Sequence, residues 1–128
     1  MSSADAGQTV LVVDDEQDVL DGCTRALTRL GFTVIPAGTQ TEALRLAEEH
    51  ADPIHLVISD VVGHYMNGRE LAAKVAERHI GVRCLLMSGY PAALLVERGL
   101  IDPGTPFIQK PFESKSFAAK VRDVLASA

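Results

Sequence analysis

Apolar residues along the chain fall into short runs that alternate with longer stretches of helical spacing. The runs have the length and β-branched character of buried strands, and they cover residues 9–13, 32–36, 54–59, 82–87 and 105–109. Elsewhere apolar residues recur every three or four positions, which predicts helices over 16–30, from 39 to the Asp52-Pro53 break, after the 63–68 loop, over 91–98 and over 114–125. Alternating strands and helices predict an α/β fold, with one parallel five-stranded sheet covered by helices on both faces.

Proline and capping residues refine the expected boundaries. Pro36 and Pro106 are predicted to lie at strand ends or on sheet edges, because proline cannot donate a hydrogen bond to a neighbouring strand. Thr39 and Glu42 have the spacing of a capping box at the start of the second helix.

Composition limits the classes of function. The 128 residues suit one domain, expected over 9–126 after a flexible polar segment at 1–8, and 47% hydrophobic residues can form a sizeable core. The net charge of −5 argues against a nucleic-acid-binding face, which would have to be basic. Cys23 and Cys84 are expected to be small buried thiols. Without a leader or a membrane-length apolar run, the expected location is the cytoplasm.

Chemistry is concentrated at the predicted carboxyl ends of the strands, where parallel α/β sheets bind their ligands. Asp14 and Asp15 follow the first strand and Asp60 follows the third, whereas Ser88 and Lys110 follow the fourth and fifth. Carboxylates gathered at one edge repel one another unless a cation neutralises them, and an all-oxygen set favours Mg²⁺. With that charge offset, Asp60 can accept a phosphoryl group, while a lysine and a hydroxyl can bind the phosphoryl oxygens.

Each of these residues has an ordinary structural explanation when taken alone. The acidic pair could complement a helix dipole, and Asp60 could be a turn residue. Ser88 could cap a helix, and Lys110 could be a solvated charge. Their joint occurrence at one edge of the predicted sheet favours a functional site.

Four motifs give a resemblance to a known family: VLVVDDE at 10–16, LVISD at 56–60, MSGY at 87–90 and KPF at 110–112. From residue 9 to residue 125 the chain resembles the receiver domain of bacterial response regulators, and most of all receivers attached to hybrid histidine kinases. The resemblance implies a flavodoxin-like, doubly wound sheet of strand order 2-1-3-4-5. It also implies a two-component signalling function without enzymatic turnover of a separate substrate.

The resemblance assigns expected roles to individual residues. Asp60 would be the phosphoacceptor, and Mg²⁺ would be held by Asp14, Asp15, Asp60 and the backbone carbonyl of Val62. Lys110 and Ser88 would bind the phosphoryl group, Phe107 would turn inward as the aromatic switch residue, and the Lys110–Pro111 bond would be cis. The donor would be a histidine kinase or histidine phosphotransfer protein, and phosphorylation would change a surface read by a protein partner or by a second copy in a dimer.

The chain departs from the family pattern in two places. Gly63 and His64 replace the Met-Pro pair that usually follows the acceptor, so we expect a looser loop, with Tyr65 and Met66 packing it. Residues 91–107 are unlike those of the commonest receivers, so we expect a short or irregular fourth helix.

The lifetime of the phosphorylated form should depend on the residues that flank the path of an attacking water. Val62 and Tyr90 are expected to border that path, and neither side chain is a strong base. We therefore expect slow self-dephosphorylation.

Three other functions are compatible with such a sheet or with parts of this residue set. A small phosphohydrolase would use Asp14, after the first strand, as its nucleophile, in a pattern that Asp14-Asp15-Glu16 does not match. A flavin-binding module would need a Gly- and hydroxyl-rich loop at the same place. A receiver-like interaction domain that is never phosphorylated is the third.

Overall fold

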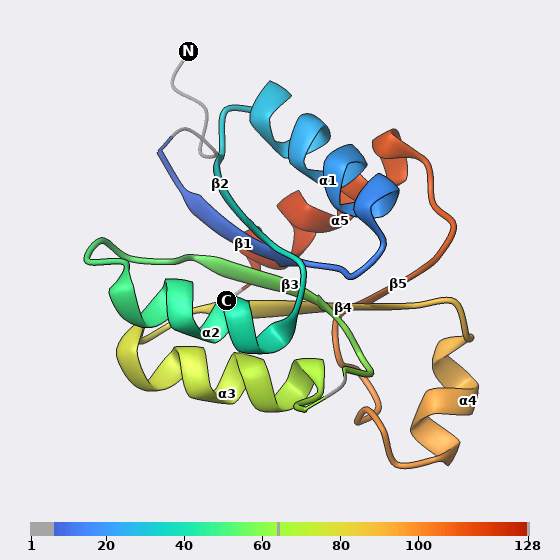
Figure 1. Cartoon of the computed structure of the whole chain (residues 1–128). Coiled ribbons are helices and arrows are strands. Elements are labelled where there is room, and N and C mark those ends of the chain that lie inside the picture. The colour runs from blue at the N-terminus through green and yellow to red at the C-terminus, as the bar shows by residue number, and fades with distance from the viewer. Residues whose placement is uncertain (1–6, 64, 128) are drawn as a thin grey trace.

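A parallel sheet of order β2-β1-β3-β4-β5 runs through the centre of the molecule, as predicted (Figure 1). The computed structural model describes residues 7–63 and 65–127. The strands are β1 Thr9–Val13, β2 Thr33–Ala37, β3 Leu56–Asp60, β4 Arg83–Ser88 and β5 Phe107–Gln109. All four strand pairings are parallel, so the five carboxyl ends lie along one edge.

Helices follow each strand and cover both faces of the sheet (Figure 1). They are α1 Gln17–Arg29, α2 Gln40–Glu49, α3 Gly68–Arg78, α4 Ala92–Glu97 and α5 Ser114–Ala126. As expected, α4 is short. Among the described residues, no helix combines the length and the apolar character that crossing a membrane requires.

Alternate residues of the central strands point to opposite faces, which divides the core in two. Val10 and Val12 of β1 pack with residues of α1 and α5, including Leu27 and Phe117. Leu11 and Val13 pack on the other face, under α2 and α3. Because both faces are covered, β1 is buried at every position, which explains its unbroken apolar run.

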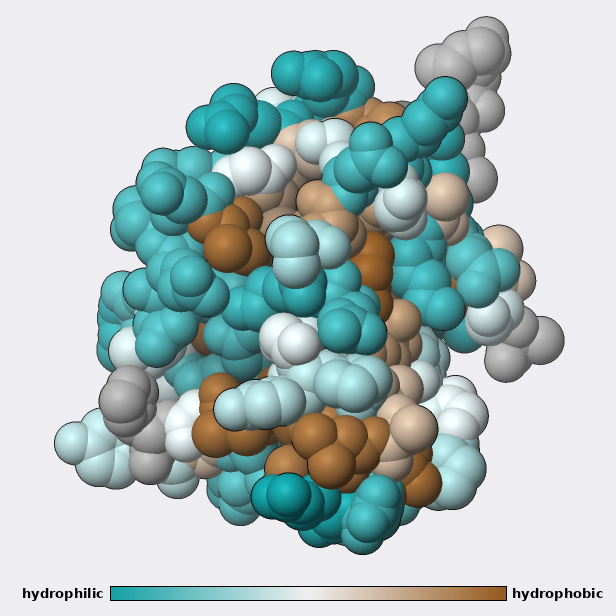
Figure 2. All heavy atoms as spheres, turned by 90° about the vertical axis from the view of Figure 1, so that its right-hand side faces the viewer, coloured by the Kyte–Doolittle hydropathy of each residue, from teal (hydrophilic) through white to brown (hydrophobic). Residues whose placement is uncertain are grey.

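A third, smaller cluster lies under α4. Val61, Leu86, Leu95 and Ile101 form its buried part, and Phe107 packs against it. Figure 2, which views the molecule from this side, shows apolar side chains gathered in its lower part.

Four of the five predicted strands have shifted boundaries in the structure. Strand β4 runs from Arg83 to Ser88, one residue later than predicted. Strand β2 extends to Ala37 and keeps Pro36 inside it, which is tolerated because β2 is an edge strand. Strand β3 begins at Leu56 rather than residue 54, since the N–H of Ile54 donates to the Nδ1 atom of the buried His79 ring at 3.2 Å. Strand β5, the other edge, begins only after Pro106.

Side chains cap the starts of α2 and α3. Thr39 accepts the N–H of Glu42 as predicted, but the Glu42 carboxylate accepts from Gly38 instead of closing the capping box. A complete capping box, which sequence reasoning missed, starts α3 between Asn67 and Glu70. These caps fix the entry of α2 and α3 beside the carboxyl end of β3.

Candidate functional site

The first and third strands bring three carboxylates together. Val13 and Ser59 are partners in the β1–β3 register, so the residues that follow them meet at the sheet edge. One oxygen each from Asp14, Asp15 and Asp60 lies within 4.8 Å of the others. Asp14 is buried, Asp60 is half-buried and Asp15 is exposed, so the cluster opens to solvent on one side.

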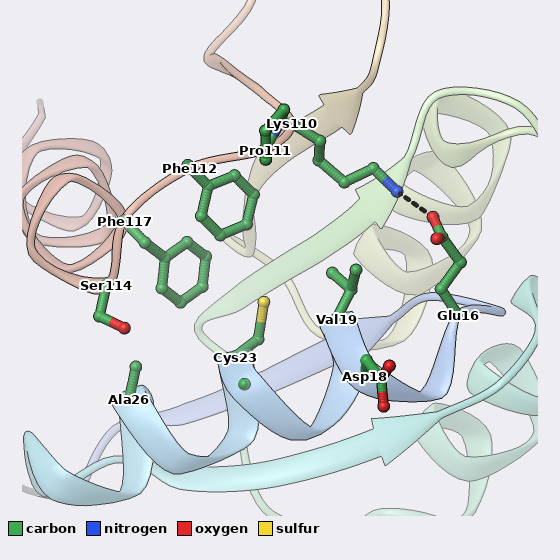
Figure 3. Close-up of a pocket in the computed structure, with 11 residues that line it drawn as sticks. Glu16, Asp18, Val19, Cys23, Ala26, Lys110, Pro111, Phe112, Ser114 and Phe117 are labelled. Carbon is green, nitrogen blue, oxygen red and sulfur yellow. Dashed lines mark hydrogen bonds and ion pairs between the residues drawn. The ribbon is translucent and has the colours of Figure 1, made fainter.

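Lys110 enters this cluster from the edge strand β5. Its backbone N–H donates to the carbonyl of Ser88 at 2.8 Å, and its peptide bond to Pro111 is cis, as expected. Its Nζ atom lies 2.8 Å from Asp60, 3.1 Å from Asp14 and 3.3 Å from Glu16, the last pair drawn in Figure 3. One ammonium group is therefore shared by three carboxyl groups.

Burial and neighbouring charges shift the pKa values of both Asp60 and Lys110. Burial raises the pKa of Asp60, the hydrogen bond from Lys110 lowers it, and the Asp14 charge raises it again, to about 6 overall. For Lys110, burial lowers the pKa, but the hydrogen bonds to Asp60 and Asp14 outweigh burial and hold it above its ordinary value. The positive charge of Lys110 therefore does not fully offset the effects of burial and of Asp14 on the pKa of Asp60.

The donor set fits a hard divalent cation. Its ligand atoms are all carboxylate oxygens, without histidine or cysteine, and Mg²⁺ is bound by a few such oxygens together with water. Val62, whose carbonyl is the fourth predicted ligand, lines a hollow of about 170 Å³ together with Asp15. The residues present therefore suit the predicted ion.

Ser88 lies at this edge, whereas Phe107 is at the opposite end of β5, three residues before Lys110. Ser88 ends β4, the neighbour of β3, and its Oγ accepts the N–H of Tyr90 at 3.0 Å. Phe107 is half-buried and pairs with Leu86 in the β4–β5 register. To act as predicted, Ser88 would have to turn away from Tyr90, and the half-buried Phe107 side chain would have to move inward.

The loop after β3 agrees with expectation at Met66 but not at Tyr65. A Cβ on Gly63 would collide with the Gln40 side chain and with the Met66 carbonyl, so the loop is closely packed at this one residue. The looser loop expected from the sequence stays a prediction. Met66 is partly buried, as predicted, whereas Tyr65 is 90% exposed and does not pack the loop. His64 lies outside the described residues.

Sequence reasoning missed two polar residues behind the site. Gln40 and Ser59 are buried and hydrogen-bonded to each other. The only signal for Gln40 is its spacing from Ala43 and Ala47, which puts it on the buried stripe of α2. For Ser59 the signal is its position inside a strand that is buried on both faces.

A larger hollow lies beside Lys110, between α1 and α5 (Figure 3). Its volume is about 390 Å³, and Val19, Cys23, Phe112 and Phe117 give it an apolar lining, with Glu16 at its rim. The two phenylalanine rings are stacked with centroids 5.1 Å apart. This face therefore joins an apolar surface directly to the acidic cluster.

Comparison with known proteins identifies the family that shares these features. The family described as "response regulator receiver domain" matches residues 10–122. Sensor kinase CckA of Brucella abortus is 35% identical over 117 residues, which make up 91% of this chain and 12% of that protein. The DNA-binding response regulator MtrA of Mycobacterium leprae is 30% identical over 115 residues, or 90% of this chain and 50% of that protein.

Solved structures agree with the sequence relatives. The receiver domain of the hybrid histidine kinase CckA superposes with a TM-score of 0.75 at 32% identity, covering 91% of this chain and 98% of that one. The chemotaxis protein CheY4 of Vibrio cholerae gives a TM-score of 0.78 at 24% identity, covering 93% and 99%, and supports the fold alone. The chain spans half or less of the two sequence relatives, and nearly all of both solved chains.

Proposed function

This chain belongs to the response regulator receiver family of two-component systems, and from that premise we propose that Asp60 is its phosphoacceptor. One observation carries the proposal: Asp60 meets Asp14 and Asp15 within 4.8 Å and lies 2.8 Å from the Lys110 ammonium group. Asp60 is half-buried rather than sealed, so a donor can reach its carboxylate from solvent.

The donor is a phosphohistidine on a histidine kinase or a histidine phosphotransfer protein. A carboxylate oxygen of Asp60 attacks phosphorus, the P–O bond forms as the P–N bond breaks, and the imidazole leaves with the bonding electron pair and takes up a proton from water. Lys110 lies close enough to Asp60 to stabilise the negative charge on the transferred phosphoryl oxygens.

Asp14, Asp15, Asp60 and the Val62 carbonyl would hold Mg²⁺. When bound, the ion would offset the repulsion between the phosphoryl oxygens and the carboxylate that attacks them. Asp14 also holds the backbone at the start of α1, because its Oδ1 accepts the backbone N–H of Glu16 at 2.9 Å.

Phosphorylation then changes the surface beside the last two strands. Ser88 leaves the Tyr90 amide to bond the phosphoryl group, and Phe107 follows inward toward the space that Ser88 leaves. The face affected shows apolar side chains around α4 (Figure 2), where Ala92, Val96 and Phe107 are only partly buried, and this suits a protein partner or a second copy in a phosphorylation-dependent dimer. The net charge of −5 supports a protein rather than a nucleic acid as that partner.

The domain extends over residues 9–126 and works in the cytoplasm, where histidine kinases phosphorylate their receivers. Its chemistry is limited to promoting its own phosphorylation and slow dephosphorylation. Signalling, rather than turnover of a substrate, is its function.

Incubation with acetyl phosphate tests the proposal directly. With Mg²⁺ the intact protein should gain the mass of one phosphoryl group, and the gain should disappear with EDTA and in Asp60→Asn. Asp52→Asn, which alters an exposed aspartate outside the cluster, is the matched control and should be phosphorylated normally.

The alternatives give different results in the same experiment. A domain that acts without phosphorylation would show no mass gain with any donor. A phosphohydrolase would turn over a generic phosphate ester and would lose that activity in Asp14→Asn but keep it in Asp60→Asn.

A further inference from the structure

Gln40 is a buried amide directly behind the acidic cluster. It is the first residue of α2, only 7% of its surface is exposed, and it follows the helix cap Thr39. A buried amide that lost its hydrogen bonds would destabilise the protein, so the partners of Gln40 indicate what it holds in place.

One side of the Gln40 amide is connected to the backbone of Asp60. Its Nε2 donates to the Oγ of Ser59 at 3.2 Å, and that hydroxyl donates to the backbone carbonyl of Asp60 at 2.9 Å. Ser59 is fully buried, so water does not compete for these bonds. The hydrogen-bonded chain ends on the residue that we propose as the phosphoacceptor.

The other side of the amide contacts Gly63. A Cβ added to Gly63 would stand 2.7 Å from the Cδ of Gln40 and would collide with its Oε1, so the Gly63 backbone lies against the amide. Gln40 is therefore connected to the segment 60–63 at both ends, through Ser59 to Asp60 and directly to Gly63. Val62, the proposed source of a carbonyl ligand, lies between these two contacts.

The same segment is tied to the sheet and to α3 at only a few other points. Val61 donates its N–H to Met87 at 2.9 Å, and its carbonyl accepts the N–H of Gly68 at 3.0 Å. These bonds hold Val61, whereas the described backbone hydrogen bonds include none made by Val62 or Gly63. Gln40 adds a side-chain contact to the part of the loop that these backbone hydrogen bonds do not reach.

Gln40 also borders the proposed metal site itself. It lines one hollow of about 170 Å³ with Asp15, Val62 and Gly63. A change in the Gln40 side chain therefore acts on the proposed ligands from close range.

We propose that Gln40, acting through Ser59 and Gly63, is a positioning residue that fixes the backbone from Asp60 to Gly63 for metal binding and phosphoryl transfer. The inference rests on the proposed function, because Val62 and Asp60 matter only if they bind Mg²⁺ and accept the phosphoryl group. It adds to that function a residue from α2, an element that supplies none of the proposed ligands.

Gln40→Met tests the proposal, because methionine keeps the length and volume of the side chain but removes the amide. Gln17→Met is the matched control: Gln17 is also the first residue of its helix, but it is exposed and bonds only to the exposed Asp21 carboxylate in the described structure. In Gln40→Met the dissociation constant for Mg²⁺ should rise about five- to twentyfold, and in Gln17→Met it should stay within twofold of the wild-type value.

Phosphorylation kinetics separate positioning from general stability. At limiting Mg²⁺ the rate of phosphorylation by acetyl phosphate should fall in Gln40→Met, and saturating Mg²⁺ should restore much of it. Amide hydrogen exchange in EDTA should become faster at Val62 and Gly63, with the central strand β1 unchanged. A merely structural role would lower the melting temperature without moving the Mg²⁺ dissociation constant of the folded protein.

The possible failures can be told apart. If the wild-type protein neither binds Mg²⁺ nor becomes phosphorylated, the proposed function fails, and exchange at Val62 and Gly63 alone then decides whether Gln40 holds the loop. If the wild type behaves as proposed while Gln40→Met matches it in Mg²⁺ affinity, rate and local exchange, the positioning role of Gln40 is overturned.

Discussion

The Lys110 ammonium group lies 2.8 Å from the Asp60 carboxylate and only 15% of its side chain is exposed. The same Nζ atom lies 3.1 Å from Asp14, which is fully buried. The Lys110 ammonium group is therefore already bound to the carboxylates at which a divalent cation is proposed to bind. The two cations should oppose each other in binding and cooperate in phosphoryl transfer.

Lys110→Ala should accordingly separate metal binding from transfer. Removal of a positive charge beside the carboxylates should tighten Mg²⁺ binding a few-fold, whereas the rate of phosphorylation by acetyl phosphate should fall at least about tenfold, since a charge-assisted hydrogen bond to the phosphoryl group is worth roughly 1.5–3 kcal/mol. Metal titration and intact-mass kinetics measure the two effects. Lys115→Ala, which removes an exposed lysine of α5, should change neither, and a rate equal to wild type in Lys110→Ala would contradict the role given to Lys110.

The raised pKa of Asp60 predicts how stability depends on pH without metal. The pKa is about 6 in the folded protein and ordinarily 3.8, so the folded state holds the proton more tightly. The stabilisation from protonated Asp60 is complete below 3.8 and is lost as pH rises through about 6. Asp60→Asn removes this dependence, so its free energy of unfolding relative to wild type should rise by about 2–3 kcal/mol between pH 4 and pH 8.

Urea unfolding in EDTA at several pH values measures that difference. Comparison of the variant with the wild type cancels the titration of the four histidines, which are present in both proteins. A relative stability that is the same at pH 4 and pH 8 would show that Lys110 compensates Asp60 fully.

Ser88 and Tyr90 provide a direct report on switching. In the structure the Ser88 hydroxyl accepts the Tyr90 N–H at 3.0 Å, and we expect Ser88 to give up this bond when it turns to the phosphoryl group. Phosphorylation should therefore shift the Tyr90 amide resonance strongly in a ¹⁵N NMR spectrum. In Ser88→Ala that resonance should already be displaced before phosphorylation and should change little afterwards, whereas Ser114→Ala, at an exposed serine, should behave as the wild type.

The residue pattern predicted which side chains meet at the sheet edge, but it did not predict the contacts that Gln40 makes behind them. Asp14, Asp60 and Lys110 could be brought together from sequence because parallel strands share one carboxyl end, so each residue that follows a strand has a known place. Gln40 could not be assigned in this way. Its partners Ser59 and Gly63 come from another element, and the spacing shows only that its side chain faces inward.

The boundaries that shifted have similar causes. The run from residue 54 is apolar enough to read as strand, but the Ile54 N–H is taken by a ring nitrogen of His79, and no local pattern shows that contact. Glu42 has the spacing of a capping box, yet its carboxylate bonds the N–H of Gly38. In both cases a side chain competes successfully for a backbone group, which is decided by tertiary packing rather than by sequence spacing.

Both thiols should be inert toward alkylation in the native protein. Burial raises the pKa of Cys23 from 9.0 to about 12, with a further contribution from the charge of Asp14, and burial raises that of Cys84 to about 12. At pH 8 the reactive thiolate should then be about a thousandfold scarcer than in an ordinary cysteine. Iodoacetamide labelling followed by mass spectrometry should show slow modification in buffer and rapid modification in denaturant, and Cys23→Ser and Cys84→Ser assign any signal.

The phosphoryl group on Asp60 should be long-lived. Val62 and Tyr90 follow Asp60 and Ser88 by two residues and are expected to border the path of an attacking water. Both are 63% exposed, and neither side chain is a strong base that could deprotonate this water. The half-life of the isolated phosphorylated protein with Mg²⁺ should therefore be minutes or longer, measured by loss of the phosphoryl mass after removal of acetyl phosphate. A half-life of seconds would contradict this reasoning.

Substitution at Val62 tests the cause of that stability. Val62→Gln places an amide that can hydrogen-bond a water beside Asp60, and it should speed dephosphorylation several-fold. Val62→Leu changes size without adding a polar group and should leave the rate near that of wild type. The backbone carbonyl of Val62, the proposed metal ligand, is present in both variants, so equal Mg²⁺ affinities would assign the difference in rate to the water. If Val62→Leu accelerates the reaction as much as Val62→Gln, access to the site rather than hydrogen bonding limits dephosphorylation.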